Sequence, residues 1–168
     1  MGMARCLVYM AIWGLVTFPM GRVFKRMGLR WDRWPFAARP WEKGGQIYEK
    51  LGVRAWKDLV PDVSKVFPSI VPRKEISGHF GSALLRDMLA ETCVAELVHG
   101  VLILAGLALP FLWPGPWGLA LCAVYILLGN LPFIIIQRYN RPRFVKLFQA
   151  AERRERRLAD AGTDIVEQ

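Results

Sequence analysis

The sequence is poor in cysteine, and this shortage excludes two kinds of site. Its three cysteines are Cys6, Cys93 and Cys122, and none stands in a CxxC or Cys/His spacing. Neither a disulfide framework nor a thiolate zinc site is therefore indicated. Two of the thiols lie inside apolar runs and the third lies at the edge of one, so we expect free, buried cysteines.

Acidic residues are also scarce: 14 Asp and Glu stand against 23 Lys and Arg, which gives a net charge of +9. A basic balance suits either nucleic acid or an anionic lipid surface. Hydrophobic residues make up 54% of the 168 residues, and the charges lie in blocks between long apolar runs. These runs favour lipid over nucleic acid, so we expect anionic membrane lipids as partners of one membrane domain, 1–168.

The first apolar run, Cys6 to Met20, predicts a transmembrane helix over residues 4–24. It is long enough to span the bilayer if Arg22 snorkels to the interface. A cleaved signal peptide is the alternative, because Arg5 precedes the apolar stretch. The absence of a small-x-small cleavage pattern after the run favours an uncleaved anchor and leaves the alternative open.

Two further runs, 92–113 and 117–136, are each long enough to cross a bilayer. Pro114-Gly115-Pro116 separates them and breaks helical structure, so the two helices are predicted to form an antiparallel hairpin. Trp113 and Trp117 flank this turn, as aromatic residues do at a membrane interface.

The distribution of basic residues predicts the orientation of the helices. One of them, Arg5, precedes the first run, fourteen lie within 22–86, eight lie within 138–157, and the turn at 113–117 has none. The positive-inside rule then places the 21–91 segment and the C-terminus of this multi-pass membrane protein in the cytoplasm. The N-terminus and the turn between the second and third helices face outside.

The segment 25–91 is too long for a bare loop and interleaves Trp with Arg and Lys. This composition is typical of a surface that lies in the headgroup layer. We expect a helix there from Trp41, after Pro40, to about Leu51. With the basic tail 137–168, the sequence predicts an all-α membrane protein with about three transmembrane helices and a cytoplasmic interfacial helical segment.

Polar residues inside the apolar runs are few, and such residues tend to be functional because they are costly in hydrocarbon. Glu96 and His99 are three residues apart on the second helix, so they share a face. A carboxylate beside an imidazole is the arrangement of a general base and the group that orients it. The alternative is that Glu96 pairs with an arginine and His99 only packs.

Asn130 on the third helix is predicted to meet His99. Each lies seven residues from the cytoplasmic end of its helix, which is about 10 Å at 1.5 Å per residue. In an antiparallel hairpin the two side chains lie at the same depth. Asn130 could then hold a hydroxyl group or donate to a developing oxyanion.

A cationic mouth is predicted directly below this pair, where Pro142 is expected to stop the helix. Arginine suits phosphate or carboxylate because its fork donates two parallel hydrogen bonds. A stop-transfer cluster would explain the arginines but not the amides among them. The predicted binding residues here are Gln137, Arg138, Asn140, Arg141 and Arg143, with Glu91 at the entrance of the second helix.

The sequence resembles the glycosyl-4,4'-diaponeurosporenoate acyltransferase family, small bacterial membrane enzymes of carotenoid pigment synthesis. The resemblance covers roughly residues 35–145, and its most specific part is the run from Gln137 to Arg143. Its other motifs are Trp41-Glu42, Gly45, Tyr48, Val53-Arg54-Ala55-Trp56-Lys57, Leu59, Pro61-Asp62, Glu91-Thr92 and Ala95-Glu96-Leu97 with His99. On these motifs Trp56 and Lys57 join the expected substrate-binding residues.

The resemblance implies esterification of a fatty acyl chain to a sugar hydroxyl of a glycosylated, carotenoid-derived lipid. We expect an acyl thioester of coenzyme A or of a carrier protein as the donor, and no bound cofactor. A non-enzymatic membrane subunit or lipid-binding scaffold is the alternative, with Glu96, His99 and Asn130 as interhelical contacts. A metal site that includes His79 is disfavoured, because no second histidine stands at ligand spacing. The oligomeric state is not indicated.

Overall fold

The computed structural model describes residues 1–60 and 81–166, and within these ranges the protein is all-helical, without a β-strand. Three helical stretches are long and apolar enough to cross a membrane: Gly2–Arg26, Ser82–Leu112 and Pro116–Ala161. The prediction of an all-α protein with about three such helices is confirmed. His79 and Pro61-Asp62 lie outside the described residues.

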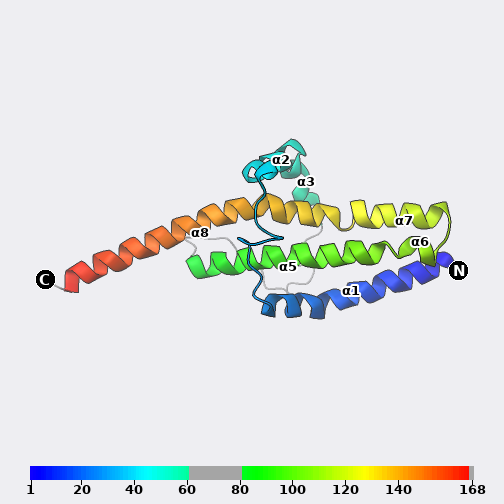
Figure 1. Ribbon diagram of the computed structural model, residues 1–168, viewed down its shortest axis with the longest axis horizontal. Helices are drawn as coiled ribbons and strands as arrows, with labels where there is room; N and C mark the ends of the chain where they lie inside the picture. Colours follow the sequence, from blue (N-terminus) through cyan, green and yellow to red (C-terminus); the bar gives the residue numbers. More distant parts are fainter. Residues whose placement is uncertain (61–80, 167–168) are drawn as a thin grey trace.

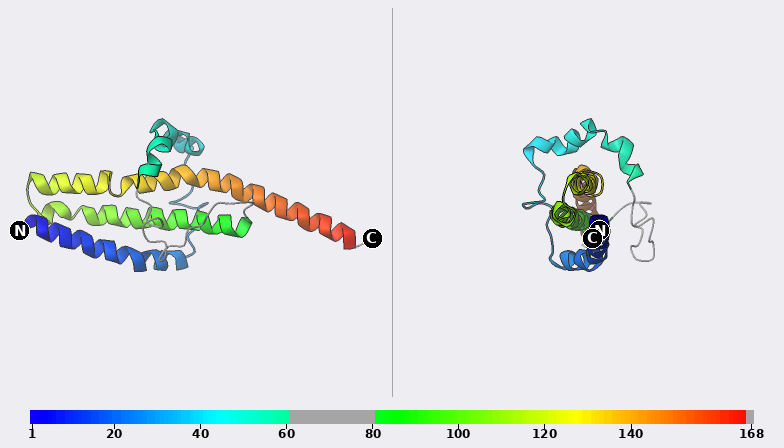
Figure 2. Two further views of the ribbon diagram at one scale, coloured as in Figure 1. Left: turned by 180° about the vertical axis from the view of Figure 1, so that it is seen from behind. Right: turned by 90° about the vertical axis from the view of Figure 1, so that its right-hand side faces the viewer.

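The long helices lie side by side, with α5 between α1 and α8 (Figures 1 and 2). The N-terminus lies at the same end of the bundle as α6, and the last part of α8 projects from the opposite end (Figure 1). The elements of this bundle are α1 (Gly2–Arg26), α5 (Ser82–Gly106), α6 (Leu109–Leu112), α7 (Pro116–Leu127) and α8 (Leu131–Val166).

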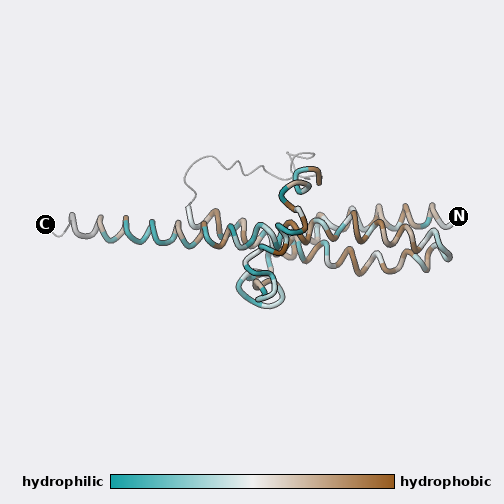
Figure 3. The backbone as a smooth tube through the Cα atoms, turned by 90° about the horizontal axis from the view of Figure 1, so that it is seen from above, coloured by the Kyte–Doolittle hydropathy of each residue, from teal (hydrophilic) through white to brown (hydrophobic). Residues whose placement is uncertain are grey.

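Hydrophobic residues are concentrated toward the N-terminal end of the bundle, and hydrophilic residues lie toward the other end (Figure 3). Leu15 on α1 is 71% exposed, and Val8 and Ile12 on the same helix are exposed as well. Side chains of this kind are stable when lipid surrounds them. The phenol of Tyr9 is satisfied within the bundle, because it donates to the carbonyl oxygen of Ala105 at 2.9 Å.

Small residues allow the helices to approach closely at the end near the N-terminus. A Cβ on Gly106 would lie 2.7 Å from Cδ1 of Tyr125, and a Cβ on Gly118 would overlap the carbonyl oxygen of Trp113. Close backbone packing of this kind is how helices associate in lipid, where the hydrophobic effect is absent. Cys6, Cys93 and Cys122 are free and buried, as predicted.

The third apolar run is interrupted, which the sequence analysis did not anticipate. α7 ends at Leu127 and α8 begins at Leu131. A Cβ on Gly129 would lie 2.7 Å from the carbonyl oxygen of Tyr125, and Pro132 stands in the first turn of α8, where its missing N–H is tolerated. A break in a membrane helix leaves backbone groups that need new partners.

Pro142 does not stop the helix, so that prediction is wrong. α8 continues through Pro142 to Val166. An internal proline costs about 3 kcal/mol, because it removes one hydrogen bond and crowds the carbonyl four residues earlier. Tyr139 and Arg141 before the proline and Phe148 after it are buried, so tertiary contacts hold the helix on both sides of Pro142.

The segment after α1 forms four short helices rather than the predicted single helix from Trp41 to Leu51. The backbone turns left-handed at Lys43, Gly44 and Gly45, with φ values of 47°, 64° and 96°. This turn ends the first piece and brings Tyr48 and Val53 onto Tyr139 of α8. The four pieces are η1 (Pro40–Gly45), α2 (Gln46–Lys50), α3 (Val53–Trp56) and η2 (Lys57–Leu59).

Candidate active site

His99 of α5 meets Asn130 at the break between α7 and α8. Nδ1 of His99 lies 3.0 Å from Oδ1 of Asn130, which confirms the prediction that the two side chains converge. Asn130 is 2% exposed. Its Nδ2 donates to the carbonyl oxygen of Tyr125 at 2.9 Å, so the side chain provides a partner for a carbonyl group next to the break.

The Asn130 contacts fix the protonation pattern of the imidazole. A backbone carbonyl only accepts hydrogen bonds, so the amide nitrogen of Asn130 must face Tyr125 and its oxygen must face His99. Nδ1 of His99 therefore carries a hydrogen and donates it. In the neutral ring Nε2 then holds the lone pair, which is the atom a general base requires.

The ring of His99 is also held by stacking. It lies parallel to the ring of Phe133, with the centroids 4.3 Å apart and an interplanar angle of 9°. His99 is partly exposed, and its Nε2 has no hydrogen-bond partner among residues 1–60 and 81–161. The imidazole is thus oriented on one side and accessible on the other.

Glu96 forms hydrogen bonds with arginines and not with His99, which corrects the predicted orienting pair. Its Oε1 accepts from Arg138 at 2.6 Å and its Oε2 accepts from Arg141 at 2.6 Å. Both carboxylate oxygens are committed to guanidinium groups, which bind a carboxylate more strongly than a neutral imidazole does. The alternative, in which Glu96 pairs with arginine, matches the structure. Asn130 takes the orienting position instead.

Arg138 links three parts of the chain. Its guanidinium donates to Glu96 of α5, to Glu42 of η1 at 2.9 Å and to the carbonyl oxygen of Pro35 at 2.8 Å. The side chain is 11% exposed. The anionic part of an acyl donor would have to displace these partners to bind here. In this structure Arg138 therefore connects the helices of the bundle and does not present a free binding group.

Arg141 is held in the same way. It donates to Oγ1 of Thr92 at 2.9 Å, to the carbonyl oxygen of Thr92 at 3.1 Å, to that of Phe36 at 2.7 Å and to Glu96. Its relative exposure is 4%. Two of the three arginines of the predicted cationic mouth, Arg138 and Arg141, are therefore not free to bind a substrate, because their hydrogen bonds go to other groups of the protein.

We refer to Glu42, Glu96, Arg138 and Arg141 as the four-charge cluster. Its two carboxylates balance its two guanidinium groups, and every side-chain polar atom buried within the described residues has a hydrogen-bond partner. A buried ion pair is stable only when its remaining hydrogen bonds are satisfied in this way. The cluster fastens the 35–48 segment to α5 and α8.

Glu42 is the member of the cluster that the site prediction missed. Burial raises the pKa of its carboxyl, but hydrogen bonds from Tyr48 at 2.6 Å and from Arg138 outweigh that effect, and the net pKa is lowered. Burial and the same bond to Glu42 raise the pKa of the Tyr48 phenol. Glu42 stands in the Trp41-Glu42 motif, which was the available signal.

The remaining predicted residues lie apart from His99. Glu91 pairs with Lys25 at 3.1 Å, Trp56 donates to the carbonyl oxygen of Leu51, and Lys57 pairs with Asp58. Arg143 pairs with Glu49 at 2.7 Å on the surface. Gln137 and Asn140 are partly buried, and their side chains have no hydrogen-bond partner within the described ranges.

The comparisons with known proteins agree with the predicted family. The family model of glycosyl-4,4'-diaponeurosporenoate acyltransferases matches residues 32–150. The chain is 32% identical over 124 residues to the protein of that name from Staphylococcus aureus (strain bovine RF122 / ET3-1), which covers 73% of each chain. It is 25% identical over 156 residues to the one from Staphylococcus haemolyticus (strain JCSC1435), which covers 90% of this chain and 89% of that relative. No solved structure matches the chain.

The matched region contains His99, Asn130 and the complete four-charge cluster. An enzyme rather than a non-enzymatic membrane scaffold is what the family indicates. The chain belongs to the glycosyl-4,4'-diaponeurosporenoate acyltransferase family, and it is an acyltransferase.

Proposed function

We propose that this membrane acyltransferase esterifies a fatty acyl chain onto a sugar hydroxyl of a glycosylated carotenoid-type lipid. The names of the relatives support this acceptor class, since both denote acyl transfer to a glycosylated diaponeurosporenoate. The observation that carries the chemistry is the His99–Asn130 pair, with an oriented, accessible imidazole inside an apolar helix. An acceptor with a long apolar part would approach this ring from the bilayer.

In the proposed reaction Nε2 of His99 takes the proton of the sugar hydroxyl as the hydroxyl oxygen attacks the acyl carbonyl carbon. The new carbon–oxygen bond forms, the bond from that carbon to the donor's leaving group breaks, and the proton passes from Nε2 to the leaving group. Asn130 is a positioning residue, because its oxygen holds the Nδ1–H tautomer. An acyl thioester of coenzyme A or of a carrier protein balances this reaction with a thiol as the product.

The structure changes the roles proposed for the other polar residues. Asn130 uses its oxygen for His99 and one of its two amide N–H groups for Tyr125, and we propose that it positions His99 rather than binding an oxyanion. The four-charge cluster lies one helical turn from His99, since Glu96 and His99 are three residues apart on α5. We propose that the cluster holds the 35–48 segment against the bundle and so shapes the approach to His99.

We further propose that the N-terminus and the 113–117 turn face outside and that residues 21–91 and the C-terminus face the cytoplasm. The distribution of basic residues supports this orientation. Reporter fusions at Pro116 and after the last residue test it. An outside signal from the C-terminal fusion would reverse the orientation and place the proposed site on the other face of the membrane.

The proposed reaction is tested by lipid chemistry. The gene is expressed in a host that makes the glycosylated acceptor and lacks an acylating enzyme, and the extracted lipids are analysed by mass spectrometry. We expect a new species that is heavier than the acceptor by one fatty acyl group. Alkaline hydrolysis should release the fatty acid and restore the acceptor. Expression of the folded protein with no acylated product would contradict the proposed acceptor.

A further inference from the structure

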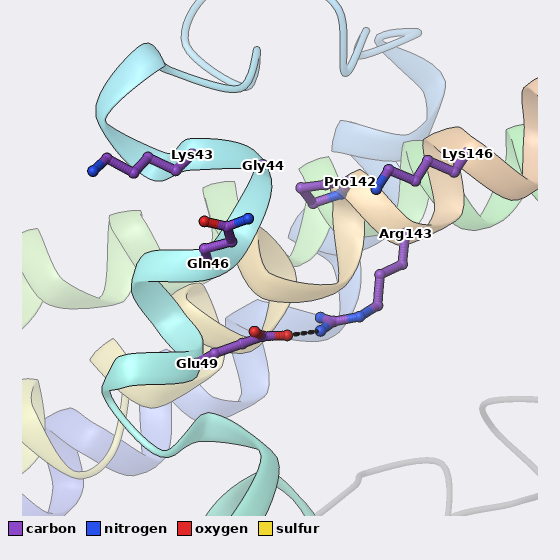
Figure 4. Close-up of a pocket in the computed structure, with 7 residues that line it drawn as sticks. All are labelled: Lys43, Gly44, Gln46, Glu49, Pro142, Arg143 and Lys146. Atoms are coloured by element: carbon purple, nitrogen blue, oxygen red, sulfur yellow. Dashed lines mark hydrogen bonds and ion pairs between the residues drawn. The ribbon is translucent and has the colours of Figure 1, made fainter.

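A cationic pocket lies between the left-handed turn at the end of η1 and the middle of α8 (Figure 4). Its volume is about 250 Å³. None of the residues around it belongs to the His99 site or to the four-charge cluster. The pocket is lined by Lys43, Gly44, Gln46, Glu49, Pro142, Arg143 and Lys146.

The charges of this pocket are unbalanced. Its lining carries three cations and a single carboxylate, Glu49, which pairs with Arg143 at 2.7 Å. Lys43 and Lys146 form no ion pair with any residue that the structure describes. In Figure 4 the amine of Lys146 extends toward Pro142 and the guanidinium of Arg143 points to Glu49, whereas Lys43 extends away from α8. The pocket therefore attracts an anion, with Lys146 and Arg143 nearest to it.

Arg143 is prepared to bind an anion. Its guanidinium carbon lies 3.6 Å from the centroid of the Tyr139 ring, and its NH1 donates to the carbonyl oxygen of Tyr139 at 2.9 Å. Its other terminal nitrogen, NH2, forms an ion pair with Glu49, and the side chains of Arg143 and Glu49 are 44% and 55% exposed, respectively. An exposed pair of this kind is weak, so a competing phosphate can displace the carboxylate at little cost.

The depth of the pocket matches the lipid headgroups. The apolar run of α8 ends at Ile136, and Arg143 lies seven residues further along the helix, which is about 10 Å. The polar headgroup layer begins where the hydrocarbon core ends. This layer is about 5–7 Å deep on each side of the bilayer. Arg143 therefore lies near its outer edge, and its long side chain can reach back to the lipid phosphates.

A second, apolar pocket lies on the same side of α8 and closer to the membrane interior. Its volume is about 270 Å³. Leu131, Ile134 and Ile135 of α8 form its apolar wall, and Arg138 of the four-charge cluster also lines it. The rest of its lining is Arg39, Trp41 and Tyr48. The segment 39–49 forms the opposite wall of both pockets. An acyl chain in the apolar pocket and a phosphate in the cationic pocket would follow the order of groups in a phospholipid.

We propose that these two pockets bind one anionic phospholipid. Its phosphate lies between Arg143 and Lys146 and displaces Glu49, Lys43 adds positive charge at the rim, and one acyl chain lies along Ile134 and Ile135. Figure 1 shows the segment that contains α2 on one side of α8 and α5 on the other. Neither His99 nor Asn130 lines either pocket, so lipid binding does not depend on the proposed acyl transfer.

Lipid binding is tested on the purified full chain in a neutral detergent, titrated with phosphatidylglycerol or with phosphatidylcholine and followed by native mass spectrometry. We expect phosphatidylglycerol to bind more tightly. R143Q and K146Q should each weaken its binding roughly fivefold, since a basic residue near a lipid surface contributes about a factor of that size. E49Q should strengthen it, because the competing carboxylate is removed. A gain of affinity cannot result from misfolding.

R153Q is the matched control, because Arg153 is an exposed arginine of the same helix outside both pockets. H99A should bind the lipid like the parent, which separates this site from the reaction. Phosphatidylglycerol with a bromine-labelled chain should quench parent fluorescence more than that of W41F, since Trp41 lines the apolar pocket. Equal affinities in R143Q, K146Q, E49Q and R153Q would overturn the proposal. Competition by inorganic phosphate with no preference for the lipid would show a soluble anion site and overturn it too.

Discussion

Oδ1 of Asn130 accepts a hydrogen bond from Nδ1 of His99 across the break between α7 and α8, at 3.0 Å. The break leaves the carbonyl oxygen of Tyr125 free to accept a hydrogen bond from the amide of Asn130, and this bond orients Asn130. The orientation of Asn130 in turn selects the tautomer of the imidazole. A backbone irregularity of this kind is costly in lipid unless side chains satisfy it. Here the side chain that satisfies it also directs the candidate base.

We expect His99→Ala to abolish acyl transfer and leave the protein folded and inserted. Loss of a general base lowers the rate by a factor of about 10² to 10⁴. Removal of a polar side chain from an apolar helix makes insertion easier, so misfolding would not explain the loss. The measurement is product formation per milligram of purified protein, with thermal unfolding in detergent as the control. Activity within a few-fold of the parent would exclude His99 as the base.

We expect Asn130→Ala to lower kcat more than it changes KM, because the tautomer with the lone pair on Nε2 is no longer enforced. The loss should be smaller than that of His99→Ala, since part of the population still presents Nε2 as the acceptor. The variant should also unfold at a lower temperature, because the carbonyl oxygen of Tyr125 loses its donor. A normal kcat in a destabilised variant would make Asn130 purely structural.

Changes to the four-charge cluster should affect stability first. Glu96→Ala leaves two buried guanidinium groups without their shared partner, and we expect a loss of about 3–5 kcal/mol in the free energy of unfolding. Arg141→Lys keeps the charge and loses the fork, so it should also destabilise the protein rather than change donor affinity. Unfolding in detergent measures both effects.

Arg143→Lys is the matched control for Arg141→Lys, because Arg143 makes an exposed ion pair on the same helix. An exposed pair contributes about 0–1 kcal/mol, so unfolding of this variant should differ little from the parent. If Arg141→Lys lowered the affinity for the acyl donor and left the stability unchanged, Arg141 would be a donor-binding residue after all.

The stability of the protein should fall at acid pH in part through Glu42. Its pKa is lowered in the folded state, so its contribution is complete above the unfolded value of about 4.3 and is lost as the pH falls through the folded pKa. The difference in unfolding temperature between the parent and Glu42→Gln should therefore be constant near neutral pH and shrink in acid. Tyr48→Phe removes a hydrogen bond that lowers this pKa, so in that background the pH-dependent loss should be smaller and should be complete at a higher pH. A difference that is independent of pH down to 3 would contradict this assignment.

The sequence determined the all-helical class of the protein and its three helices that are long and apolar enough to cross a membrane, because both depend on length and hydrophobicity along the chain. Runs of about 20 apolar residues predict bilayer helices whatever their neighbours are, and the same pattern predicted buried thiols. The depth of His99 and Asn130 also followed from counting residues, since the helical rise is constant. The family followed from motifs that are contiguous in the chain.

Only the tertiary structure decided which polar groups become partners. Sequence spacing placed Glu96 beside His99 on one helix, but two guanidinium groups from α8 compete for that carboxylate and bind it more strongly. The continuation of α8 through Pro142 depends on packing that outweighs local propensity, whereas the break after Leu127 follows a local signal, Gly129 and Pro132, that the sequence analysis did not use. The cluster with Glu42 joins residues almost 100 positions apart, and no local pattern records such a contact.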